Sequence, residues 1–135
     1  MTKKRILIID DDVPLTQLLK INLDHTGEYE VHVENRPTRA LSAAHHFRPD
    51  IILLDYIMPG LDGGDVSRQF NEDAVLKKIP ILMVTALVSN SEITSDGLVH
   101  MSGHLMLPKP FKFEKLKQCI KQLLNGAEES LSHHS

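Results

Sequence analysis

The sequence has almost no cysteine, since Cys119 is the one thiol in 135 residues. A single cysteine forms neither an internal disulfide nor a zinc site built from several thiolates. A chain of this length does not need such cross-links, because it buries roughly 70% of the surface that its unfolded form exposes. We therefore expect one domain, with Cys119 packed as an inert thiol on the last helix.

An excess of positive charge is also missing. The 15 Lys and Arg residues are outnumbered by 18 Asp and Glu residues, which gives a formal net charge of −3. Domains that bind nucleic acid on their own are usually basic, so we expect no nucleic-acid partner.

Long apolar runs are absent as well. The first run, residues 6–9, ends at Asp10 and is too short for the core of a signal peptide. No other run approaches the ~18 apolar residues that cross a bilayer. We expect a cytoplasmic protein with no membrane partner.

The sequence does contain a regular alternation of two kinds of segment. Four short apolar runs indicate buried parallel strands, and a fifth segment, in which polar and apolar residues alternate, is typical of a strand near the sheet edge. In chain order the five predicted strands are 6–9, 29–33, 51–54, 81–84 and 105–107. Stretches with helical spacing of apolar residues lie between them.

Capping and breaking residues predict where these helices begin and end. Asp12 would cap the first helix and Gly27 would end it, while Pro49 would stop the second. A shorter third helix is expected after Gly64, and the last helix is expected to stop at Gly126.

Two segments give weaker patterns. Residues 88–101 are rich in residues of low helix propensity, and we expect a short fourth helix there. Residues 127–135 would form a polar tail or the remnant of a linker.

The alternation predicts an α/β fold with a five-stranded, doubly wound parallel sheet, because parallel strands need crossovers and right-handed helical crossovers cover both faces. Ligands of such sheets bind at the carboxyl ends of the strands. Those ends carry Asp10 and Asp11, then Asp55, Thr85 and Lys109. We expect these side chains to converge.

Carboxylates brought together in this way repel one another unless a cation lies among them. Mg²⁺ prefers oxygen ligands and is often held by one or two carboxylates together with a phosphate. A carboxylate can also attack phosphorus and form an aspartyl phosphate. The pattern therefore predicts a site for Mg²⁺ and a phosphoryl group, with Thr85 and Lys109 contacting the phosphoryl oxygens.

Four segments together resemble the receiver domain of two-component response regulators. In order, they are Ile8-Ile9-Asp10-Asp11, then Leu53-Leu54-Asp55 with Met58-Pro59-Gly60 and Asp62-Gly63, then Val84-Thr85-Ala86, then Lys109-Pro110-Phe111. Each segment lies at a predicted strand end. The resemblance implies a receiver domain over residues 1–126, with a flavodoxin-like fold and strand order 2-1-3-4-5.

The resemblance also implies roles for single residues. Asp55 would accept the phosphoryl group. Asp11 would bind Mg²⁺ directly, Asp10 would hold it mainly through water, and Asp55 and the backbone carbonyl of Ile57 would complete the protein ligands.

By the same resemblance, Thr85 and Lys109 would contact the phosphoryl group, and the Lys109–Pro110 peptide would be cis. Rearrangement of Thr85 and Lys109 would carry a signal to the face formed by the expected fourth helix, the fifth strand and the last helix. The donor would be a sensor histidine kinase or a phosphotransfer protein, and the output would be contact with a downstream protein. Such a domain catalyses only its own phosphoryl transfer and dephosphorylation and is not otherwise an enzyme. Whether the chain forms a homodimer is left open by the sequence.

The sequence departs from the family pattern at two positions. Met106 stands where the family usually has Tyr or Phe, and it lacks a hydroxyl and a rigid ring. Pro108 removes a backbone donor at the end of the fifth strand. The apolar neighbours Ile57 and Leu87 predict, by resemblance, a long-lived aspartyl phosphate.

Three other functions share some of these features. A phosphatase of the haloacid dehalogenase type also begins with an Asp-x-Asp segment, but the acidic pair expected after the lysine is missing here. A flavodoxin-like binding module would need a phosphate loop after the first strand, where this chain has three carboxylates. A receiver-like scaffold without phosphorylation stays open.

Overall fold

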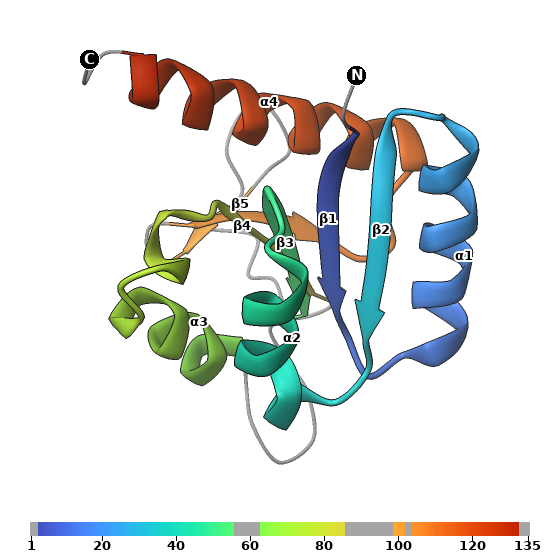
Figure 1. Cartoon of the computed structure of the whole chain (residues 1–135). Coiled ribbons are helices and arrows are strands. Elements are labelled where there is room, and N and C mark those ends of the chain that lie inside the picture. The colour runs from blue at the N-terminus through green and yellow to red at the C-terminus, as the bar shows by residue number, and fades with distance from the viewer. Residues whose placement is uncertain (1–2, 56–62, 86–98, 102–103, 133–135) are drawn as a thin grey trace.

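The computed structural model describes residues 3–55, 63–85, 99–101 and 104–132 and arranges them as a six-stranded sheet with helices on both faces (Figure 1). The strands are β1 (Lys4–Ile9), β2 (Tyr29–Glu34), β3 (Ile51–Asp55), β4 (Ile81–Thr85), β5 (Val99–Met101) and β6 (His104–Pro108). Their spatial order is β2-β1-β3-β4-β6-β5. The five predicted strands are thus present and parallel, and they follow the predicted order 2-1-3-4-5.

The edge strand β5 corrects the helix expected over residues 88–101. Val99–Met101 pairs antiparallel with β6, with Met101 opposite His104. Only two residues separate the two strands in the sequence, and so short a connection suits a hairpin. Pairing with β6 provides hydrogen-bond partners for backbone groups of Val99–Met101. Helix propensity is low around Gly97 and Gly103, so a helix is not favoured there. The rest of the expected fourth helix lies outside the described residues.

The helices form two layers, one on each face of the sheet. Helices α1 (Val13–His25) and α4 (Phe113–Ser132) cover one face, and α2 (Ala40–Phe47) and α3 (Gly63–Glu72) cover the other (Figure 1). The alternation of side chains along β1 explains both layers, because Ile6 and Ile8 pack under α1 and α4 while Leu7 and Ile9 pack under α2 and α3.

The predicted ends of the first two helices are confirmed. The side chain of Asp12 accepts a hydrogen bond from the backbone N–H of Leu15 at 3.1 Å and so caps α1. Gly27, at φ +75°, takes the left-handed conformation directly after this helix. Helix α2 follows a short 3₁₀ turn (Pro37–Arg39) and ends at Phe47. Its C-cap residue Arg48 has φ 55° and directly precedes Pro49.

The expected end of the last helix at Gly126 is wrong, since α4 continues to Ser132. A glycine inside a helix costs only about 1 kcal/mol relative to alanine. The residues that follow, Ala127, Glu128 and Glu129, are good helix formers and carry the helix on. None of the helices in the described ranges is both long and apolar enough to cross a membrane.

Candidate functional site

The carboxyl ends of three parallel strands bring together the acidic and basic side chains that the sequence predicts. Asp10 follows β1, Asp55 is the last residue of β3, and Lys109 follows β6. All three strands belong to the parallel series β1-β3-β4-β6, so their carboxyl ends lie at one edge of the sheet. The lysine therefore reaches carboxylates that lie far from it in the sequence.

Lys109 bridges the two buried carboxylates. Its Nζ atom lies 3.0 Å from Asp10 Oδ2, where it donates a hydrogen bond, and 3.7 Å from Asp55 Oδ2. The carboxylate side chains are only 5% and 8% exposed, and the lysine side chain is 20% exposed. Burying a charged group is costly unless an opposite charge lies close to it, and the ammonium provides one positive charge beside the two carboxylates.

Asp11 adds a third carboxylate that faces solvent. One oxygen from each of Asp10, Asp11 and Asp55 lies within 4.8 Å of the others. Carboxylate oxygens at this separation suit a hard divalent cation such as Mg²⁺, which keeps several waters and takes few protein ligands. The donor set therefore fits Mg²⁺, and the exposure of Asp11 leaves an open side for water and phosphate.

The turn between β1 and α1 is held by its own hydrogen bonds. The backbone N–H of Asp12 donates to Asp10 Oδ1 at 2.9 Å. The other carboxylate oxygen of Asp10 is the one that contacts Lys109, so both oxygens have protein partners. Asp12 caps α1 and is not among the clustered carboxylates, which confirms its prediction as a cap.

A residue that contacts this turn from the end of β2 was missed by the sequence prediction. Asn35, which follows β2, donates from Nδ2 to the backbone carbonyl of Asp10 at 2.8 Å and to Thr16 Oγ1 at 3.0 Å. A polar residue directly after a predicted strand, at the edge that carries Asp10, was the signal that could have identified it.

One predicted site residue is only partly described, and another lies outside the described residues. Thr85 is the last residue of β4 and pairs with Pro108, so its backbone lies at the same sheet edge. Its side chain and the whole of Ile57 lie outside the described residues, and their roles stay predictions. The Lys109–Pro110 peptide is cis, as the resemblance implies.

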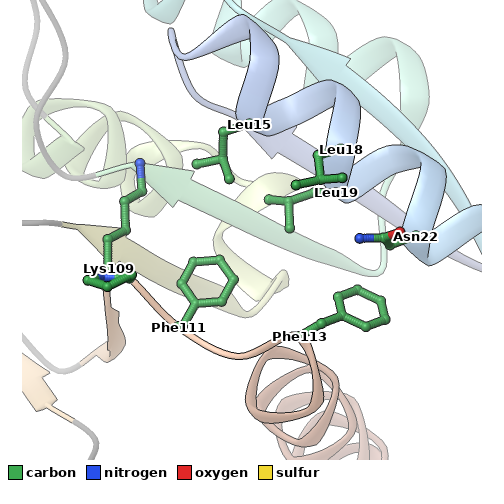
Figure 2. A pocket seen from close by; sticks show the side chains of 8 residues that line it. Leu15, Leu18, Leu19, Asn22, Lys109, Phe111 and Phe113 are labelled. Atoms are coloured by element: carbon green, nitrogen blue, oxygen red, sulfur yellow. The ribbon is translucent and has the colours of Figure 1, made fainter.

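An apolar pocket of about 400 Å³ borders this site. Helix α1 forms one wall, and the segment from Lys109 into α4 forms the other (Figure 2). The lining residues are Leu15, Leu18, Leu19, Asn22, Lys109, Pro110, Phe111 and Phe113. Lys109 thus belongs both to the pocket and to the carboxylate site. Leu18, which lies on the pocket wall, is 55% exposed.

Comparison with protein families identifies one match over most of the chain. The family model of the response regulator receiver domain matches residues 6–121. The chain is 35% identical over 127 residues to the DNA-binding response regulator MtrA of Mycolicibacterium paratuberculosis, covering 94% of this chain and 54% of that protein. It is 38% identical over 120 residues to the response regulator MprA of Mycobacterium leprae, covering 89% and 50%. The chain thus spans about half the length of the curated relatives it matches.

Solved structures agree with this match. The response regulator protein TrrA of Thermotoga maritima, in complex with Mg(2+)-BeF, has a TM-score of 0.71 and 30% identity, with 89% of this chain and 98% of that chain covered. The chemotaxis response regulator CheY4 of Vibrio cholerae has a TM-score of 0.73 and 28% identity, with 90% and 99% covered.

Proposed function

The chain belongs to the response regulator receiver family, and we propose that it accepts a phosphoryl group on Asp55 in a two-component phosphorelay. The observation that carries this proposal is the position of Lys109, whose ammonium lies beside both buried carboxylates while Asp11 completes an acidic cluster. The haloacid dehalogenase alternative leaves this family match and the position of Asp55 unexplained.

In the proposed reaction, the P–N bond of a phosphohistidine on the donor protein breaks as a P–O bond forms to the Asp55 carboxylate. The imidazole is the leaving group. Lys109 is placed to shift its ammonium from the carboxylates toward a phosphoryl oxygen, because its Nζ is within 4 Å of Asp55 Oδ2. Asp10, Asp11 and Asp55 would hold Mg²⁺, which when bound supplies positive charge that stabilises the transferring group.

Thr85 and Ile57 complete the proposal on the strength of the family pattern. Thr85 would donate its hydroxyl to a second phosphoryl oxygen, and the carbonyl of Ile57 would be a further Mg²⁺ ligand. The position of the Thr85 backbone beside Pro108 supports the first of these roles.

The donor protein would dock on the pocket between α1 and the start of α4. This surface is continuous with the site, because Lys109 lines both, and Leu18 and Ile21 on α1 expose 55% and 65% of their surface. Apolar contacts there would hold the phosphohistidine close to Asp55. The donor would be a sensor histidine kinase or a phosphotransfer protein in the cytoplasm.

The output would be contact with a downstream protein through the face that includes β6 and α4. The named relatives include DNA-binding regulators, but they are about twice as long as this chain. We propose no nucleic-acid contact for these 135 residues, in keeping with their net charge of −3.

Intact-mass analysis after incubation with a small phosphodonor tests the proposal. We expect one phosphoryl adduct that depends on Mg²⁺ and is absent from Asp55→Asn. Asp24→Asn is the matched control, since Asp24 lies on α1 and pairs with Lys20 outside the site. A folded wild-type protein that gains no adduct would overturn the proposal and favour the scaffold alternative.

A further inference from the structure

Asn35 connects two parts of the chain that surround the acidic cluster. It lies one residue after β2, is half-buried, and uses a single side-chain nitrogen for two hydrogen bonds. One reaches the carbonyl of Asp10 at 2.8 Å and the other reaches the hydroxyl of Thr16 at 3.0 Å. An amide nitrogen carries two hydrogens, so both bonds can form together.

The first hydrogen bond extends the pairing of β1 and β2 by one step. The ladder ends with Ile9 opposite Glu34, and the N–H of Asp10 still donates to the carbonyl of Glu34 at 3.2 Å. The carbonyl of Asp10 then meets the side chain of Asn35. The backbone of Asp10 is therefore held on both sides at the residue whose carboxylate enters the site.

The second hydrogen bond fixes the start of α1. Thr16 is fully buried, donates its hydroxyl to the carbonyl of Val13 at 2.9 Å, and accepts from Asn35. The first turn of the helix is thereby tied to the end of β2. Asp11 lies between these two anchored points and is exposed, so holding the backbone on either side limits where its carboxylate can lie.

We propose that Asn35 is a positioning residue that raises the affinity of the site for Mg²⁺ by holding Asp10 and Asp11 in place. The inference rests on the proposed function, because it assumes that the three carboxylates bind the cation. Asparagine suits the task because it donates two hydrogen bonds without adding charge beside three carboxylates. Partners of metal ligands of this kind typically change metal affinity by 10–100-fold when removed.

The test compares wild type and Asn35→Ala in a titration with MgCl₂, followed by the backbone amide NMR signals of residues 9–16. We expect the Kd for Mg²⁺ to rise roughly 10-fold in Asn35→Ala. At saturating Mg²⁺, the rate of phosphorylation by a small phosphodonor should return to within about 2-fold of wild type, because Asn35 does not touch the reacting atoms.

Two matched comparisons separate positioning from general loss of structure. Asn71→Ala, at an exposed position on α3, should bind Mg²⁺ as wild type does. Thr16→Val removes the hydroxyl that Asn35 contacts, whereas Thr16→Ser keeps it. We expect weakened Mg²⁺ binding in Thr16→Val and recovery in Thr16→Ser, and this pair decides the matter if Asn35→Ala does not fold.

The outcomes distinguish this inference from the proposed function. If wild type binds Mg²⁺ and forms the Asp55 adduct while Asn35→Ala shows the same Kd, the role of Asn35 is refuted and the proposed function stands. A wild-type protein that binds no Mg²⁺ contradicts both. A higher Kd in Asn35→Ala that persists with an unchanged melting temperature supports the inference.

Discussion

The ammonium of Lys109 lies 3.0 Å from Asp10 Oδ2 across a sequence separation of 99 residues. The contact joins the ends of β1 and β6, which are not adjacent strands, because β3 and β4 lie between them. The same nitrogen is 3.7 Å from Asp55 Oδ2. Among the described ion pairs, Lys109 is the positive group that lies beside both of these buried carboxylates.

Lys109→Gln should destabilise the Mg²⁺-free protein. Glutamine can still donate a hydrogen bond, but it removes the positive charge that Lys109 holds beside the buried Asp10 and Asp55. We expect the free energy of unfolding to fall by about 1–3 kcal/mol, less than for a fully buried pair because Lys109 is partly exposed. Urea unfolding in the presence of EDTA measures this loss.

Adding Mg²⁺ should recover part of the stability lost in Lys109→Gln, since a cation bound by the native state alone stabilises it. Lys112→Gln is the control, because Lys112 is exposed on the same segment. Equal unfolding midpoints for Lys109→Gln and wild type in EDTA would show that the lysine does not stabilise the carboxylate pair.

Leu18→Glu should slow phosphoryl transfer from a phosphohistidine protein without affecting a small phosphodonor. Leu18 lines the pocket beside Lys109 and is 55% exposed, so a charge there would oppose apolar docking. We expect the rate constant for transfer from the protein donor to fall roughly 10-fold or more, as for loss of one central apolar contact. The two donors are compared by the same intact-mass assay.

Val75→Glu is the control for that prediction. Val75 is 45% exposed and precedes Leu76, which packs in the core under α2 and α3, away from the pocket. Its transfer rate should match wild type. If Leu18→Glu and Val75→Glu behave alike with the protein donor, the pocket is not the docking surface.

The sequence predicted the parallel sheet and the acidic cluster because each depends on local signals that the fold preserves. The buried strands have short apolar runs, and Asp10, Asp55 and Lys109 directly follow or end them. Parallel strands necessarily bring such positions to one edge. Asp12 was predicted as a cap for a similar reason, since capping is decided within a few residues.

The features that the sequence did not predict are not decided by a single local signal. Strand β5 forms because β6 offers an open edge, which the composition of Val99–Met101 does not reveal. Asn35 acts through contacts with Asp10 and Thr16, which lie 25 and 19 residues away. The continuation of α4 past Gly126 reflects the weakness of one glycine as a stop signal when good helix formers follow.

Two glycines should respond in opposite ways to alanine. Gly126 lies inside α4, and a Cβ there would meet nothing within 4 Å. Gly126→Ala should therefore stabilise the protein by about 0.4–1 kcal/mol. Gly27 has equal space but φ +75°, so Gly27→Ala should destabilise it by about 1–2 kcal/mol. Urea unfolding of the two variants checks both signs, and stabilisation by Gly27→Ala would contradict the left-handed turn.

Acid should destabilise the wild-type protein partly through His104. This residue begins β6, and its Nε2 atom is hydrogen-bonded to Ser67 Oγ on α3 at 2.9 Å. Burial lowers the pKa of His104 below its ordinary value. As the pH falls from about 7.5, the unfolded chain takes up a proton at this position before the folded chain does. The stability that neutral His104 contributes is thus present above its ordinary pKa and is lost as the pH falls toward its lower pKa in the folded state.

His104→Gln keeps a side chain that can hydrogen-bond with Ser67 but does not titrate. We expect the difference in unfolding midpoint between pH values of about 7.5 and 5.5 to be smaller in His104→Gln than in wild type. The exposed His46→Gln serves as the control, because it removes a histidine outside this contact. If both variants keep the wild-type pH dependence, protonation of His104 costs the fold nothing, and the contact with Ser67 tolerates the charged ring.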